Sequence, residues 1–314
     1  MTKKFLTYNE QIDYLKNNKK IIINDENAAI ETLKKLGYFS LISGYKTPFK
    51  NPQTNQYLEN TTFEGIVALY CLDENLRELF LKYILKIERH IRSLLSYNFT
   101  QKYGENQSEY LNKNNYNNKN NNNWYNTNLD KLIRILDKLA NENSDYPYIN
   151  HQREAYNNVP LWVLFNGISF GTLSKFYFFS EQDIRSRVAK EFENVNQKQL
   201  DQYLKVLTKF RNVCAHGDRL FSYKTKNSIP DTILHRKLKI INTKGYFIQG
   251  KNDLFAIVIT LRYLLSNEDF KAFKKNLSII LQQYLNSSYA ISTSELYKMM
   301  GFPHEWKKIN YYKK

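Results

Sequence analysis

Cysteine is scarce in this sequence of 314 residues, which contains only Cys71 and Cys214. Two cysteines exclude a disulfide framework. They also cannot form a cysteine-type zinc site without several histidines, and the chain has five histidines in all. Both cysteines fall inside helical patterns, so we expect them to be small core residues in a reducing compartment.

Glycine and proline are also few, at 10 and 6, and alternating strand patterns are rare, which favours an all-α protein. Long apolar runs are missing too. No run approaches the roughly 18 residues of a membrane span, and the beginning of the chain, MTKKFLTYNEQ, has no apolar signal segment. We therefore expect a cytoplasmic protein with no membrane partner.

Acidic residues are outnumbered, since 30 Asp and Glu face 46 Lys and Arg and give a formal net charge of +16. Such a surplus attracts polyanions, with nucleic acid first and anionic membranes second. The alternative is genomic drift, because Lys, Asn, Ile and Tyr are the residues that an AT-rich genome enriches. A hydrophobic share of 42% with 15% aromatics indicates that most of the chain folds.

Apolar residues recur at helical spacing in several segments. Residues 63–99 carry one continuous stripe, which predicts one long helix or two consecutive helices. Residues 198–216 show the same spacing, and Gly217 is a natural stop for that helix. Further helices are expected at about 129–140, 161–165, 254–265 and 270–285.

Three features between the predicted helices indicate loops, turns or strands. The Asn-rich residues 112–128 predict a low-complexity loop. Gly171 is expected to allow a tight turn before the next helix. Residues 237–250, KLKIINTKGYFIQG, predict a β-hairpin around an Asn-Thr-Lys-Gly turn. The expected architecture is a helical bundle with helical extensions and a small β-hairpin.

The candidate for chemistry is RNVCAH at 211–216, an Arg followed five positions later by a His. With Gly217 next, His216 lies in the last helical turn, where the negative end of the helix dipole favours the imidazolium. An Arg and a cationic His suit a phosphate, and a His suits proton transfer at an RNA 2′-hydroxyl. Asn212, four residues before His216, could orient the ring or contact a ribose.

In one respect, helical geometry argues against this interpretation. Arg211 lies beside the apolar stripe, whereas His216 lies roughly 140° further round an ideal helix. A buried Arg needs an acidic partner, and Glu88, on the flank of the stripe and in register with Arg92, is our candidate. The alternative is that Arg211 and Glu88 only pair at a helix crossing and that His216 is a helix-end cap.

The motif resembles the R-x4-6-H signature of HEPN ribonuclease domains. The wider chain resembles abortive-infection (Abi) proteins of the AbiD/AbiF type, which defend bacteria against phages. Four blocks match in the expected order: LGYFSLISGYKTPF at 36–49, the segment 63–93, LWVLFNGISFGTLSKFY at 161–177 and RNVCAHGDRLF at 211–221. The resemblance covers roughly residues 5 to 225.

The resemblance implies a HEPN-like helical domain at 1–225, and we expect residues 226–314 to add the hairpin and a helical extension on the same core. It further implies metal-independent RNA cleavage without a cofactor, with Arg211, His216 and Asn212 as the catalytic residues. A HEPN site is built from two facing motifs, so it implies a homodimer. Some related Abi proteins pair with a structured noncoding RNA, which makes such an RNA a further expected partner.

The basic residues near the motif are the candidates for RNA binding: Arg89, Arg92, Lys209 and Arg219. Two other functions stay open. One is a non-catalytic protein that holds a structured noncoding RNA. The other is a helical interaction module that senses a phage protein. An intact Arg211 and His216 favour the ribonuclease, because a pure binder has no need of a titratable His.

Overall fold

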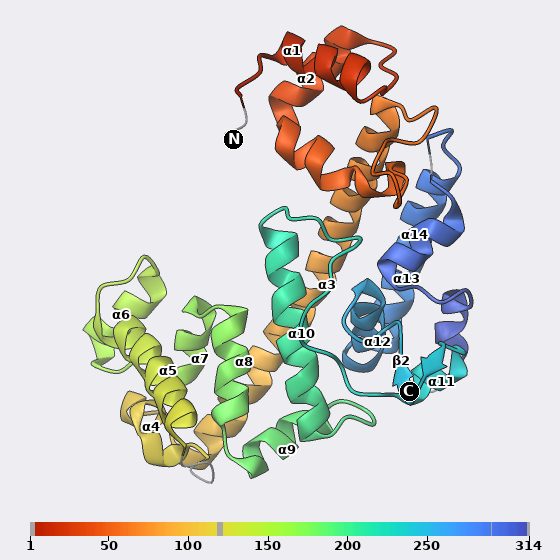
Figure 1. Ribbon diagram of the computed structural model, residues 1–314. Helices are drawn as coiled ribbons and strands as arrows, with labels where there is room; N and C mark the ends of the chain where they lie inside the picture. Colours follow the sequence, from red (N-terminus) through yellow and green to blue (C-terminus); the bar gives the residue numbers. More distant parts are fainter. Residues whose placement is uncertain (1–3, 118–121, 290, 313–314) are drawn as a thin grey trace.

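The computed structural model describes residues 4–117, 122–289 and 291–312. Over these residues the protein is all-α apart from one two-stranded antiparallel sheet, so the predicted fold class is confirmed. Figure 1 shows the long helix α3 (Phe63–Tyr103) running through the molecule, with other helices along its sides and at both ends.

The remaining elements follow the chain in order. Before α3 lie α1 (Tyr8–Asp13), α2 (Glu26–Leu36) and short helical turns at Tyr14–Asn18, Phe39–Ser43 and Thr47–Phe49. After it come α4 (Gln107–Leu111), a turn at Lys113–Asn115, α5 (Asn123–Asn141), α6 (Pro147–Tyr156), α7 (Leu161–Leu164), a turn at Phe165–Gly167, α8 (Phe170–Phe179), α9 (Gln182–Lys190) and α10 (Gln197–Ala215). The C-terminal part contains α11 (Ile233–Lys237), β1 (Asn242–Thr243), β2 (Tyr246–Phe247), α12 (Leu254–Leu264), α13 (Asn267–Leu285), α14 (Thr293–Met300) and a turn at Trp306–Tyr311.

Helix α3 begins and ends at residues suited to helix boundaries. The Thr62 hydroxyl accepts a hydrogen bond from the Gly65 N–H at 3.0 Å, and the helix ends at Gly104, whose φ is +95°. Between these ends a stripe of buried side chains recurs every three or four residues, among them Leu69, Leu72, Leu76, Ile84, Ile91 and Leu95. The pattern that allowed one helix or two therefore forms one helix of 41 residues, about 60 Å long.

Helices from distant parts of the chain pack on α3. Helices α10 and α13 make the most extensive contacts, and α7, α8 and α9 also touch it. Helix α10 runs antiparallel to α3 (Figure 1), so the C-terminal end of α10 lies beside the first half of α3. Helix α12 packs against α3, α10 and α13, and every one of its residues is buried. Helix α10, which carries the motif at its C-terminal end, is therefore packed between α3 and α12.

The predicted hairpin is present, with short strands. Asn242 pairs with Phe247 and Thr243 with Tyr246, so the two turn residues are Lys244 and Gly245. Both have positive φ, at 52° and 86°, as a two-residue hairpin turn requires.

Three sequence expectations were wrong. The Asn-rich segment is not all loop, because helix α5 already begins at Asn123, where the Asn122 side chain accepts from the Tyr125 N–H; residues 118–121 of that segment lie outside the described part. Gly171 makes no turn, since it lies in the first turn of α8 after the N-cap Ser169. Cys71 is exposed on α3, and only Cys214 is buried.

No helix in the described part of the chain combines the length and the apolar character that crossing a membrane demands.

Candidate functional site

Helix α10 carries the Arg-to-His motif at its C-terminal end. The helix starts with a capping box, in which the Asn196 side chain accepts from the Gln199 N–H at 2.9 Å. It ends at His216, whose φ of −90° and ψ of 0° leave the α-helix, and Gly217 follows with φ +71°. The predicted stop at Gly217 is confirmed, and it turns the chain away directly after the histidine.

The Glu88 carboxylate joins the motif to α3. Its Oε2 lies 3.6 Å from Nε of Arg211, and its Oε1 accepts a hydrogen bond from Nη2 of Arg92. Arg92 Nη2 also donates to the Ile168 carbonyl at 2.8 Å. The side chain of Glu88 is only 3% exposed. The ion pair between Arg211 and Glu88 that the sequence predicted is thus present at the crossing of α3 and α10.

One buried carboxylate balances two guanidinium groups, so the cluster keeps a net positive charge. The Arg211 side chain is 30% exposed, and its two Nη nitrogens donate no hydrogen bond to any residue that the structure describes. Nε of Arg211 forms an ion pair with Glu88 but no hydrogen bond. With both Nη atoms also unbonded, the guanidinium presents the fork that binds a phosphate in bidentate fashion.

The His216 side chain is exposed, and no described residue hydrogen-bonds to its ring. The sequence suggested that the Asn212 side chain could orient the ring. Among the described residues, the hydrogen bond between Asn212 and His216 joins only their backbones, with the His216 N–H donating to the Asn212 carbonyl at 2.9 Å. The Asn212 side chain is exposed as well. The imidazole is accordingly open to an incoming ligand or to a second protein chain.

Cys214 is the other reactive side chain within the motif. Burial raises the pKa of its thiol to about 12. The thiol is therefore mostly protonated near neutral pH, which makes Cys214 a weak nucleophile.

A buried polar network fixes the chain that follows the motif, and sequence reasoning missed it. The Asp73 carboxylate on α3 accepts hydrogen bonds from the Leu220 N–H at 2.9 Å and the Phe221 N–H at 2.6 Å. It also accepts from the Tyr45 hydroxyl at 2.7 Å and from Arg77 Nη1 at 2.9 Å. Burial raises the pKa of Asp73, while these donors oppose that shift. The sequence signal for this network was a pair of charged residues, Asp73 and Arg77, four positions apart on an apolar stripe.

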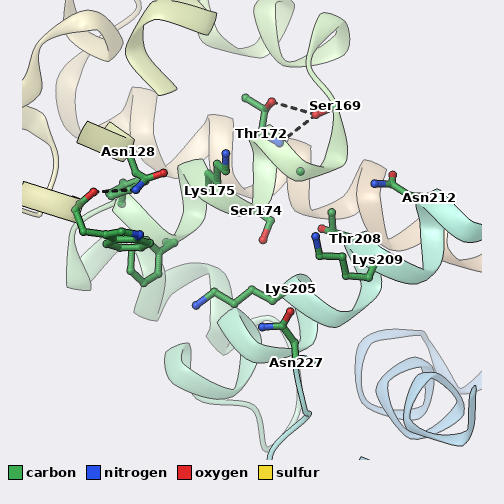
Figure 2. A pocket seen from close by; sticks show the side chains of 14 residues that line it. Asn128, Ser169, Thr172, Ser174, Lys175, Lys205, Thr208, Lys209, Asn212 and Asn227 are labelled. Carbon is green, nitrogen blue, oxygen red and sulfur yellow. Dashed lines mark hydrogen bonds between the residues drawn. The ribbon is translucent and has the colours of Figure 1, made fainter. Parts of the chain in front are cut away.

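Asn212 also lines a hollow of about 590 Å³ beside the motif, between α5, α8 and α10 (Figure 2). We call it the lysine hollow, because Lys175 of α8 and Lys205 and Lys209 of α10 all line it. Trp124 and Asn128 contribute from α5. Of the residues predicted to bind RNA, only Lys209 belongs to this hollow.

The other predicted RNA-binding residues lie elsewhere. Arg89 lines a separate hollow beside α9 and the end of α12. Arg92 is engaged by Glu88 and Ile168, as described above, and Arg219 Nη1 donates to the Gly44 carbonyl. Within the described residues, no three His, Cys, Asp or Glu side chains gather closely enough to hold a metal ion.

Comparison with known proteins identifies the family. Neither curated proteins nor solved structures gave a significant match. A family profile described as Abi-like protein matches residues 31–222, more than half of the chain and the whole of α3 through α10. The chain therefore belongs to the Abi-like protein family.

Proposed function

We propose that this protein is a phage-defence ribonuclease of the HEPN type, which cleaves RNA without a metal ion. The observation that carries the proposal is the state of Arg211. Its Nε forms an ion pair with Glu88 at 3.6 Å, its two Nη nitrogens donate no hydrogen bond to any described residue, and His216 is exposed at the end of the same helix. Membership of the Abi-like family supports the role in defence.

In the proposed reaction, the 2′-oxygen of a ribose attacks the adjacent phosphorus. The new P–O2′ bond forms as the P–O5′ bond breaks, which yields a 2′,3′-cyclic phosphate and a 5′-hydroxyl. One group must take the 2′-hydroxyl proton and another must protonate the leaving 5′-oxygen. His216 fills one of these roles, and Arg211 offsets the charge that develops on the phosphate.

One chain supplies one such histidine, so the second comes from a second copy. A two-fold homodimer is the simplest closed arrangement, with the two His216 side chains lining a shared groove. Mass measurement in solution after nuclease treatment tests this. We expect twice the 37.5 kDa of the chain, and a strictly monomeric particle would defeat the composite site.

The decisive experiment compares His216→Ala and Arg211→Ala with the unmodified protein on total cellular RNA. We expect cleavage to fall on the order of 10²- to 10⁴-fold in each, with both variants folded. The 2′,3′-cyclic phosphate ends should disappear in parallel. His304→Ala removes another exposed histidine and should leave cleavage unchanged. Arg211→Lys keeps the charge but loses the fork, so we expect it to restore only part of the activity.

A non-catalytic RNA-binding function is the second candidate, favoured by one observation. The lysine hollow beside the motif offers amines and amides but no titratable histidine. If purified protein carries a defined noncoding RNA and the His216→Ala variant is as toxic as the unmodified protein, the binding function replaces the enzymatic one. Sequencing the RNA that co-purifies with the protein identifies this partner.

A further inference from the structure

The charged residues that line the lysine hollow are all cationic. None of the described side chains that line it is acidic, and three of them are lysines. Lys205 is partly neutralised by Asp201, 2.7 Å away on the same helix, whereas Lys175 and Lys209 are exposed and form no ion pair with any described residue. Lys205 and Lys209 are also four residues apart on α10, where like charges repel. An anionic ligand would relieve this repulsion.

A tryptophan lies at the rim of the same hollow. Trp124 lines it and is 62% exposed, and its ring meets that of Phe178 edge to face, with centroids 6.2 Å apart. The Phe178 ring in turn lies 4.5 Å from the Lys205 amine. An indole left this open, in a hollow lined by three lysines, is the combination that binds unpaired bases by stacking and their phosphates by charge.

Small polar groups complete the lining. Figure 2 shows the Ser174 hydroxyl in the space between α8 and α10, facing the lysines of α10. Ser174 is only 6% exposed, and its hydroxyl makes no hydrogen bond to any described residue. Asn212 and Asn227 add exposed amides. The hydroxyl and the two amides can all hydrogen-bond a polar ligand.

We propose that the lysine hollow binds a short unpaired stretch of RNA, with a base on Trp124 and phosphates on Lys175 and Lys209. Its volume falls in the range of ligand sites. Asn212 belongs to both the hollow and the motif, so the hollow borders the motif there, although neither Arg211 nor His216 lines it. This inference rests on the proposed action on RNA and assigns the hollow as the subsite that holds the strand beside the scissile phosphate.

The test measures binding of a fluorescein-labelled, unstructured RNA oligonucleotide by anisotropy, with every variant in a His216→Ala background that prevents cleavage. Trp124→Ala should weaken binding about 5- to 150-fold. The Lys175→Ala/Lys209→Ala double variant should weaken it at least tenfold and reduce the salt slope by about 1.4. The matched controls are Trp162→Ala, an exposed tryptophan outside the hollow, and Lys237→Ala/Lys275→Ala, which removes the same charge elsewhere.

Affinities equal to those of the controls would overturn the inference. A perfect RNA duplex should bind independently of Trp124, and an equal loss on the duplex would contradict binding of unpaired bases. DNA of the same sequence that binds as tightly as RNA would overturn the assignment to RNA. Cleavage is read separately with His216 intact. If the hollow variants lose binding but the protein with His216 intact never cleaves RNA, only the ribonuclease proposal fails. If the hollow variants bind and cleave RNA normally, only this inference fails.

Discussion

The Glu88 carboxylate lies between two guanidinium groups on a helix crossing, and its environment is almost closed to water. Both partners are better exposed, at 20% for the Arg92 side chain and 30% for Arg211. In such a cluster the loss of the single carboxylate leaves two cations facing each other at the edge of the core. Removing one partner of a buried pair is more costly than the pair itself is stabilising.

Glu88→Gln tests this at nearly constant volume. We expect the free energy of unfolding to fall by about 1–3 kcal/mol, below the range for a fully buried pair because solvent screens both arginines. Urea denaturation measures it. Glu74→Gln, an exposed glutamate on the same helix, should change the value by less than about 0.5 kcal/mol. Equal values for the two variants would contradict a stabilising role for Glu88 between the two arginines.

His235 is fully buried in the C-terminal part and has a defined tautomer. Its Nδ1 accepts from the Thr232 N–H at 3.1 Å, so Nε2 carries the hydrogen and donates to the Gly250 carbonyl at 2.8 Å. Burial lowers the pKa of His235 from 6.5 to about 4. Between these values the unfolded chain binds a proton that the folded protein does not.

Stability contributed by neutral His235 is therefore fully present above pH 6.5 and is lost as the pH falls through about 4. The shift corresponds to about 3 kcal/mol. Burial raises the pKa of the nearby Asp253 to about 6. Asp253 has the opposite effect, because the stability that it contributes falls as the pH rises toward 6. The stability difference between the unmodified protein and His235→Asn isolates the histidine. It should narrow from pH 7 to pH 4, and a constant difference would contradict the assignment.

At the scale of elements, the end of α10 depends on the left-handed conformation of Gly217. Its φ is +71°, and a Cβ there would meet no atom within 4 Å. A substitution would therefore act through the backbone conformation alone. The two sides of this turn are fixed separately, by the helix before it and by the hydrogen bonds from Leu220 and Phe221 to Asp73 after it.

Gly217→Ala should lower the free energy of unfolding by about 1 kcal/mol, because alanine resists positive φ. Gly217→Asn should recover most of that loss, since asparagine tolerates the left-handed region. Thermal unfolding compares the two. Gly44→Ala, at a glycine of ordinary φ with nothing closer than 4.0 Å, should be neutral. An alanine variant as stable as the asparagine one would mean that the turn rearranges freely.

At the scale of the whole molecule, the family match and the folded core have different limits. The match ends at residue 222, yet α12 is buried along its whole length against α3, α10 and α13. Helix α13 in turn packs along α3, with Phe273 edge to face on Phe80 at 5.1 Å. The C-terminal residues thus cover the same helices that carry the motif.

A chain that stops at residue 225 should therefore fail to fold alone. Without α12 and α13, it would expose a large apolar area on α3 and α10, and each large side chain left uncovered costs about 1.5–3 kcal/mol. We expect no cooperative urea transition and strong binding of a hydrophobic dye. Co-expression of residues 226–314 as a separate chain should restore solubility. A shortened chain that unfolds cooperatively by itself would place the domain boundary near residue 225.

The sequence alone determined the features that a single helix encodes. The apolar spacing located α3, α10, α12 and α13, Gly217 marked the end of α10, and helical register selected Glu88 as the partner of Arg211. These inferences succeeded because helical periodicity and capping are local properties, set by residues a few positions apart.

Only the tertiary structure decided what depends on which helices meet. It placed Trp124, Lys175 and Lys209, which are far apart in sequence, around one hollow, and joined Asp73 to the backbone of Leu220. It also exposed Cys71, which lies on a helix with a buried stripe but outside that stripe's contacts. Periodicity reports which face of a helix is apolar. The partner that covers that face is selected by packing and long-range contacts, which spacing along the chain does not record.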